Sequence, residues 1–159
     1  MEFNLKFIPD KNYYKEAYDE MVSSMKYKKY VPYFASALIF VGIVFYFLDK
    51  SGVIGILPFL FICSGLFEFF KFYNEKRKWI KDRFDSRILG KEIQIEFTDE
   101  MIKINGPFSN GELKWFGLKK IVKTKQGILL KPENGLSIYL QDKIFSSYEQ
   151  IEFVLSKGN

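Results

Sequence analysis

Two long apolar runs dominate the chain. The first run, residues 31–48, carries no charged residue over 18 positions. The second run begins at Val53 and stays uncharged through Phe67, after which Glu68 interrupts it. A helix of 18 residues is about 27 Å long, close to the roughly 30 Å of a bilayer's hydrocarbon core. The length of the first run therefore indicates a membrane-spanning helix, and the second run repeats the pattern.

A soluble protein with two buried core helices is the alternative interpretation. A core helix normally has a polar stripe at a period of about 3.6 residues. Neither run has such a stripe. A chain of 159 residues is also too short to surround two such helices with a soluble shell. The pattern thus predicts a transmembrane helical hairpin over residues 31–73, with the reversal at residues 49–52.

Positive charge gathers beside both ends of the predicted hairpin. Between Lys71 and Lys91 there are eight basic and three acidic residues, whereas nine of each sign cancel from Glu92 onward. The positive-inside rule then places both termini in the cytoplasm of a multi-pass protein of the cell membrane. The side chains expected at the membrane interface are Lys26, Lys28, Lys29, Lys71, Lys76, Arg77, Lys78 and Lys81. Nucleic acid is not expected as a partner, because no recognisable nucleic-acid-binding module accompanies this charge.

Small residues indicate where the two spans pack. Ala35 and Gly42 lie seven positions apart on one helix face, and Gly65 of the second run can face them. Small side chains let membrane helices approach closely. Glu68 is the ionisable residue within a span, and we expect it to reach the interface or to pair with Lys71 three positions later.

The segments around the hairpin are polar. Residues 1–8 alternate apolar and polar positions, which predicts a strand, and residues 13–30 predict an amphipathic helix leading to the membrane. Residues 75–89 predict a basic helix that ends before Gly90. We therefore expect an N-terminal segment at residues 1–30 and a juxtamembrane basic helix at residues 74–91, with the hairpin between them.

Residues 92–159 predict a small β domain closed by a helix. The expected strands cover residues 92–97, 101–104, 112–116, 119–125, 127–131 and 136–140. Ser146 or Ser147 begins a capping box for the last helix. Because an unpaired strand edge is unfavourable, the N-terminal strand should join this sheet. The expected fold is α+β: a sandwich or partly open barrel of seven strands, plugged by the C-terminal helix, with the hairpin inserted after the first strand.

A loose motif pattern runs through the predicted β domain. It consists of Ile95-x-Phe97-x-Asp99-Glu100, Gly111-x-Leu113-x-Trp115, Ile121, Gly127-Ile128-Leu129-Leu130, Ile138-Tyr139-Leu140 and Phe145-Ser146-Ser147. In this pattern and in layout, the chain resembles the YcxB-like family of bacterial membrane proteins. The resemblance implies a pleckstrin-homology-like domain at residues 92–159 and a membrane location, and it implies no activity. The chain departs from the family at Gln141-Asp142-Lys143-Ile144, where the family usually has Pro-Lys-Arg; this weakens an anion-binding role at that corner.

The chain lacks the usual materials of catalysis. It has no histidine, and its single cysteine, Cys63, lies within the second apolar run. A thiolate is unfavourable in such surroundings, and histidine is the commonest general base. No glycine-rich phosphate loop occurs. The carboxylate pairs Asp99-Glu100 and Asp82/Asp85 fit a turn and a solvated helix face. We expect no enzyme activity, no cofactor and no metal site.

Three functions stay open. The first is a membrane-anchored protein whose pleckstrin-homology-like domain binds a protein partner or anionic lipid headgroups, the latter through Lys119, Lys120, Lys123 and Lys125. The second is a small membrane immunity or regulatory protein that acts on a toxin, transporter or kinase through its hairpin. The third is a pore or transporter subunit, which two nearly uncharged helices could form only as a homo-oligomer.

Overall fold

A computed structural model of the protein describes residues 1–49, 52–53 and 55–158. The chain forms two compact units. One unit, which we call the body, comprises Met1–Ser24 and Ile80–Asn159, and the other, which we call the helical pair, comprises Met25–Trp79. Together they give an α+β protein with four α-helices and two antiparallel sheets among the described residues.

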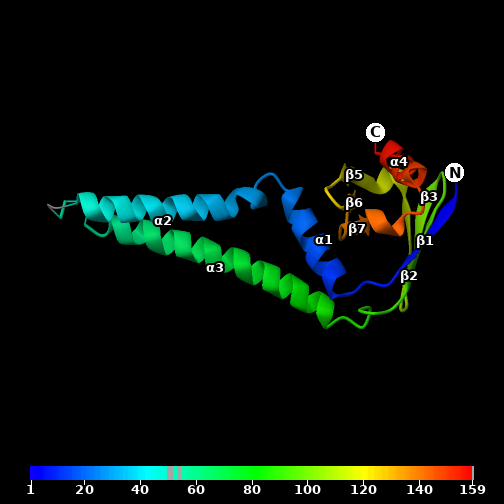
Figure 1. Ribbon diagram of the computed structural model, residues 1–159, viewed down its shortest axis with the longest axis horizontal. Helices are drawn as coiled ribbons and strands as arrows, with labels where there is room; N and C mark the ends of the chain where they lie inside the picture. The colour runs from blue at the N-terminus through cyan, green and yellow to red at the C-terminus, as the bar shows by residue number, and fades with distance from the viewer. Residues whose placement is uncertain (50–51, 54, 159) are drawn as a thin grey trace. The chain divides into compact units, whose positions relative to one another are not determined.

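The helical pair contains α2 (Val31–Leu48) and most of α3 (Leu57–Phe84), which lie side by side in antiparallel directions (Figure 1). A short 3-10 turn, η1 (Lys28–Tyr30), leads into α2. Pro32 lies in the first turn of α2, where its missing N–H breaks no hydrogen bond. Within the part of the chain that the structure describes, one helical stretch is long and apolar enough to cross a membrane, namely Lys28–Leu48.

The second helix differs from its prediction at both ends. Because α3 begins at Leu57 and not at Val53, only residues 57–67 of the helix precede the charge of Glu68. A helix of that length measures about 16 Å. The predicted reversal at residues 49–52 includes Lys50 and Ser51, which lie outside the described residues. At the other end, the predicted helical continuation to Leu89 is too long, since α3 ends at Phe84.

The continuity of α3 has a local cause. Residues 74–84 contain no Gly or Pro, the two residue types that most strongly disfavour a helix interior. The basic segment therefore continues the apolar one within a single helix, as the sequence indicated.

The N-terminal helix is shorter than expected. After β1 (Phe3–Phe7), α1 spans Lys11–Ser23, and the Asp10 carboxylate caps it by accepting a 2.7 Å hydrogen bond from the Tyr13 backbone N–H. The predicted continuation to Tyr30 is wrong. The Ser23 and Ser24 hydroxyls donate to the backbone carbonyls of Glu20 and Met21. Such back-bonding competes with helical hydrogen bonds.

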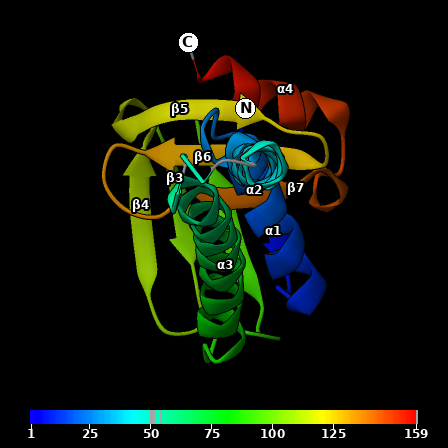
Figure 2. The same cartoon turned by 90° about the vertical axis from the view of Figure 1, so that its left-hand side faces the viewer.

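Seven strands form the two sheets of the body. Sheet A has the order β1-β2-β3-β4 and sheet B has the order β5-β6-β7. The remaining strands are β2 (Ile93–Phe97), β3 (Met101–Asn105), β4 (Asn110–Lys114), β5 (Leu118–Lys123), β6 (Gly127–Pro132) and β7 (Ile138–Gln141). β1 pairs antiparallel with β2, with Phe3 opposite Phe97, so the N-terminal strand has the partner expected for it. Figure 2 shows the strands of sheet B running across those of sheet A.

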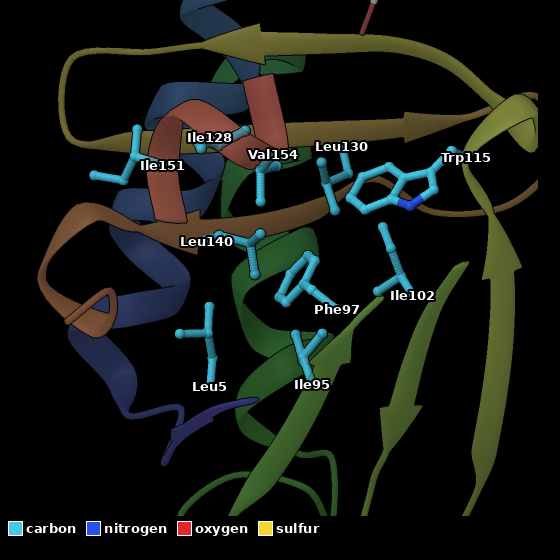
Figure 3. Close-up of a cluster of buried hydrophobic side chains, with 10 residues drawn as sticks. All are labelled: Leu5, Ile95, Phe97, Ile102, Trp115, Ile128, Leu130, Leu140, Ile151 and Val154. Atoms are coloured by element: carbon cyan, nitrogen blue, oxygen red, sulfur yellow. The ribbon is translucent and has the colours of Figure 1, made fainter. Parts of the chain in front are cut away.

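The core of the body lies between the two sheets and α4 (Tyr148–Ser156). Figure 3 shows side chains from both sheets and from α4 pointing into one cluster. Its members are Leu5, Ile95, Phe97, Ile102, Trp115, Ile128, Leu130, Leu140, Ile151 and Val154. Because apolar side chains alternate along the strands, each sheet contributes one face to this core.

The passage from sheet A to sheet B is tighter than the sequence indicated. The strand predicted at residues 112–116 ends at Lys114, and Trp115–Gly117 forms a 3-10 turn, η2. This turn brings the Trp115 ring over the core, where its Nε1–H donates a 2.9 Å hydrogen bond to the Thr98 carbonyl. The buried indole N–H therefore has a hydrogen-bond partner, as a buried Trp side chain usually does.

Candidate functional site

The contact between α2 and α3 depends on two glycines. A Cβ atom on Gly42 would lie 2.7 Å from both the Pro58 carbonyl oxygen and Ile62 Cγ1. A Cβ atom on Gly65 would lie 2.7 Å from the Ala35 carbonyl oxygen. Real Cβ atoms do not approach backbone so closely, so the helices reach this separation only because these positions lack side chains. The structure thus brings together Ala35, Gly42 and Gly65, which all lie in the buried seam of the pair.

Outside this seam, the helical pair presents apolar side chains to its surroundings. Ala35 and Gly42 are the buried residues of α2, and Pro58 and Gly65 are those of α3. Large side chains are exposed along both helices: Phe34, Phe40, Phe47, Leu48, Phe59, Leu60, Leu66, Phe67 and Phe70. An exposed apolar surface of this extent calls for a covering other than water.

The basic residues predicted for the membrane interface lie along the ends of the same helices. Lys28 forms a 2.8 Å ion pair with Glu75, and the Lys29 ammonium lies 4.8 Å from the Tyr30 ring centroid. The others are exposed or half-exposed along α3 or before α2: Lys26, Lys71, Lys76, Arg77, Lys78 and Lys81.

Glu68 lies in a small cavity of the helical pair, which we call the hairpin pocket. The cavity measures about 120 Å³ and is lined by Tyr27, Lys28, Val31, Glu68, Lys71, Phe72 and Glu75. The ion pair expected between Glu68 and Lys71 does not form. Among the described residues, neither side chain has an ion-pair or hydrogen-bond partner. Spacing of three residues allowed the pair, but Glu68 and Lys71 instead both face the cavity.

The body has a larger hollow, which we call the lysine pocket. It measures about 410 Å³ and is lined by Trp115, Phe116, Leu118, Lys119, Lys120, Ile121, Lys157 and Gly158. Phe116 is 83 % exposed, and the Lys114 ammonium lies 5.7 Å from its ring centroid. An exposed aromatic ring among lysines combines an apolar surface with positive charge, which suits an amphipathic anion.

Positive charge in and beside the lysine pocket is only partly compensated. Lys120 lies directly opposite Lys131 across β5 and β6, and like charges in this position are unfavourable. Burial, and then the charge of Lys120, lower the pKa of Lys131. Lys157 contacts Asp99 at 3.1 Å, and hydrogen bonds from the N-terminal ammonium and Lys157 lower the pKa of Asp99. Lys119 and Lys120 have no carboxylate partner among the described residues.

Two of the four lysines predicted to face anionic lipid lie elsewhere. Lys123 forms a 2.6 Å ion pair with Asp142, which neutralises it. Lys125 lies at the turn after β5, where its backbone N–H donates to the Glu20 carboxylate. Of the four predicted lysines, Lys119 and Lys120 line the lysine pocket, where Lys157 from after α4 joins them.

A polar network joins α1 to sheet B. The Tyr139 hydroxyl donates a 2.5 Å hydrogen bond to Glu16, and the Gln141 amide donates a 2.7 Å bond to the same carboxylate. The Tyr13 hydroxyl donates to the Tyr139 carbonyl at 2.7 Å. Burial raises the pKa values of Tyr13 and Tyr139 far above their usual range. Since both tyrosines stay protonated, the network holds α1 on β7.

Sequence reasoning missed Phe116 and Lys157 as site residues. The pattern places Phe116 on a strand, and Lys157 follows the last helix as an ordinary surface residue. The available signal was the order of residues 114–120, where Trp115, Phe116 and Leu118 alternate with Lys114, Lys119 and Lys120 around Gly117. Their convergence with Lys157 depends on how α4 packs against β5, which a linear pattern does not reveal.

Comparison with known proteins gives no relative for this chain. No family model, no curated protein and no solved structure matches it.

Proposed function

We propose that this protein is a non-enzymatic membrane anchor whose body binds anionic lipid headgroups at the cytoplasmic surface. The observation that carries the proposal is the exposed apolar surface of the helical pair. A soluble protein would bury a helix such as α2, whereas here its only buried residues are Ala35 and Gly42, and most of its large side chains are exposed. A bilayer covers such a surface on all sides.

In this proposal α3 is the second span. Its uncharged part is short, but residues 57–73 can all cross the bilayer if Glu68 and Lys71 reach the headgroups. A helix of that length measures about 25 Å. Tyr30, Tyr33 and Tyr73 are also exposed near these ends of the helices, and exposed tyrosines are enriched at the level of the headgroups. Both termini then lie in the cytoplasm, where the basic residues of α3 and of the segment before α2 meet anionic lipid.

The body supports a pleckstrin-homology-like arrangement. Four antiparallel strands, then three, then a helix against the core follow the order expected for that fold. The insertion of the helical pair after β1 is also the layout that underlies the resemblance to the YcxB-like family. We therefore propose a pleckstrin-homology-like fold for the body and membership of the YcxB-like family for the chain.

Charge favours headgroups over a protein partner. The lysine pocket holds three lysines, of which Lys119 and Lys120 lack a carboxylate partner among the described residues. Near a membrane surface, each of these lysines would contribute about 1 kcal/mol to attraction by anionic lipid.

The alternative function, regulation of a toxin, transporter or kinase through the hairpin, would use Gly42, Gly65 and Glu68. Gly42 and Gly65 are occupied by the contact between α2 and α3 and so are not free to receive a partner helix.

Fractionation tests the membrane assignment. The chain, tagged at its C-terminus, should stay with membranes through carbonate and high-salt washes, and in closed right-side-out vesicles the tag should resist protease. Release by carbonate would refute the anchor.

Fluorescence tests the headgroup assignment. Trp79→Phe leaves Trp115, which lines the lysine pocket, as the one tryptophan. In detergent, short-chain phosphatidylglycerol should shift its emission, whereas short-chain phosphatidylcholine should not. The double variant Lys119→Gln/Lys120→Gln should lose the shift, and Lys143→Gln, an exposed lysine outside the pocket, should keep it. An equal response to both lipids would refute headgroup binding at this site.

A further inference from the structure

The hairpin pocket combines two unmatched charges of opposite sign. Lys28 and Glu75 satisfy each other through their 2.8 Å ion pair. Glu68 and Lys71 line the same cavity, and neither has an ion-pair or hydrogen-bond partner among the described residues. The cavity thus offers one carboxylate and one ammonium group at the end of the apolar part of α3.

We infer that the hairpin pocket binds the headgroup of a zwitterionic aminophospholipid. The primary ammonium of such a headgroup would donate to Glu68, and its phosphate would accept from Lys71. Lys28 can add a further donor, because an ammonium group has three N–H bonds and Glu75 occupies only part of them. This inference rests on the proposed membrane placement of α2 and α3.

Other headgroups fit the charges less well. A purely anionic headgroup would bring its phosphate beside Glu68 without neutralising that carboxylate, and a cation alone would leave Lys71 unmatched. A quaternary ammonium has no N–H to donate, and it is usually held by a cage of aromatic rings. Among the described residues that line the pocket, the aromatic ones are Tyr27 and Phe72, which do not make a cage. A primary ammonium joined to a phosphate satisfies both free charges at once.

The size of the cavity agrees with a headgroup and not with a whole ligand. Pockets for drug-sized molecules begin at roughly 300 Å³. The hairpin pocket, at about 120 Å³, is well below that size. A lipid can place only its polar group there and must leave its acyl chains outside. Val31 lines the cavity where α2 begins, and the apolar surface of the pair extends from there.

Native mass spectrometry of the full chain in detergent tests this inference. The delipidated protein is titrated with phosphatidylethanolamine, phosphatidylcholine or phosphatidylglycerol of matched acyl chains. We expect the unmodified chain to retain phosphatidylethanolamine best. Glu68→Gln should weaken that retention about tenfold or more, since a charge-assisted hydrogen bond is lost, and should reduce the difference between the ethanolamine and choline lipids.

Matched variants separate the pocket from general charge effects. Asp82→Asn removes a carboxylate from the same helix outside the pocket and should leave the preference unchanged. Lys71→Gln should weaken retention of the ethanolamine lipid, because the phosphate loses a donor while Glu68 is unchanged. Far-UV circular dichroism should show the helical content of each variant to be that of the unmodified chain.

Several results would overturn the inference. Equal retention of ethanolamine and choline lipids by the unmodified chain would mean that Glu68 does not distinguish a primary ammonium from a quaternary one. Undiminished retention in Glu68→Gln would place the lipid elsewhere. Displacement of the lipid by an equal concentration of soluble phosphoethanolamine would make the free molecule, and not a membrane lipid, the ligand.

The two proposals fail in distinguishable ways. Carbonate extraction would refute the membrane anchor without reference to lipid type. A Trp115 response that is absent with phosphatidylglycerol, or equal for both lipids, would refute anionic binding by the body. An unselective hairpin pocket would refute only the inference drawn here.

Discussion

Replacing Gly65 by alanine should separate α2 from α3. The added Cβ atom would lie 2.6 Å from Ile39 Cγ1 and 2.7 Å from the Ala35 carbonyl oxygen, whereas ordinary contacts begin at 3.4 Å. The side chain of Ile39 can rotate away, but the Ala35 carbonyl is part of the helix backbone. The helices must therefore move apart locally by up to the difference of 0.7 Å between 3.4 and 2.7 Å.

The expected loss of stability combines two costs and one gain. Overpacking costs about 1–3 kcal/mol, and the backbone contact places this case at the upper end. Alanine gains about 1 kcal/mol over glycine in helix propensity. A gap of about 0.5–1 Å also forfeits roughly a quarter to a half of the dispersion energy of each separated atom pair. We expect a net loss of about 2 kcal/mol, or roughly a thirtyfold shift of the unfolding equilibrium.

The assay is unfolding of the full chain in mixed micelles by increasing sodium dodecyl sulfate, followed by far-UV circular dichroism. Ser64→Ala is the control, because Ser64 lies on the exposed side of α3 beside Gly65. Such a surface change should alter the stability by at most about 0.5 kcal/mol. If Gly65→Ala were as stable as this control, the close packing of the pair would be refuted.

Gly42→Ala should behave like Gly65→Ala in the same assay, because its Cβ atom would also meet a backbone carbonyl at 2.7 Å. The double variant should lose less than the sum of the two single losses, because one separation of the helices relieves both clashes. Fully additive losses would mean that the two contacts relax independently.

Three further predictions concern the body. Phe97 is fully buried and stacks on Phe3. Phe97→Ala should therefore destabilise the body by about 3–5 kcal/mol in urea unfolding followed by near-UV circular dichroism, and a loss below about 1 kcal/mol would contradict the described core. In Trp115→Phe the Thr98 carbonyl loses its indole donor. This change should cost about 1–3 kcal/mol in the same assay, and an unchanged midpoint would mean that water replaces the donor. Burial raises the pKa of Tyr13, so the folded protein keeps this proton above about pH 10 while the unfolded chain releases it. Stability from Tyr13 is therefore full below about pH 10 and falls above it by at most about 1.4 kcal/mol per pH unit, and Tyr13→Phe should show a shallower fall between about pH 9 and 11; parallel curves would contradict the assignment.

The sequence by itself determined the elements that depend on local pattern. Alternation of apolar and polar residues indicated β1 and β2, because a strand with one buried face needs a period of two. Turn residues between short apolar segments indicated the other five strands close to their observed positions. The uncharged run at Val31–Leu48 coincides with α2, since nothing in it ends a helix. Small residues at 35, 42 and 65 marked the face on which helices can approach.

The ends of the helices depended on competition between side-chain and helical hydrogen bonds, which the hydrophobic pattern does not show. Ser23 and Ser24 end α1 through hydrogen bonds to the backbone, although apolar spacing continues past them. α3 begins at Leu57, four residues after the start of the apolar run. It passes residue 74 without a break, because helical hydrogen bonding does not distinguish its apolar part from its basic part.

Only the tertiary structure decided which charged groups meet. Glu68 and Lys71 are spaced for an ion pair, yet Lys28 pairs with Glu75 across the helical pair, and the first two are left facing a cavity. Lys119 and Lys120 acquire Lys157 as a neighbour because α4 packs on β5, whereas Asp142 neutralises Lys123. Local propensity acts over a few residues, but a binding site depends on contacts between residues tens of positions apart, and packing alone sets these.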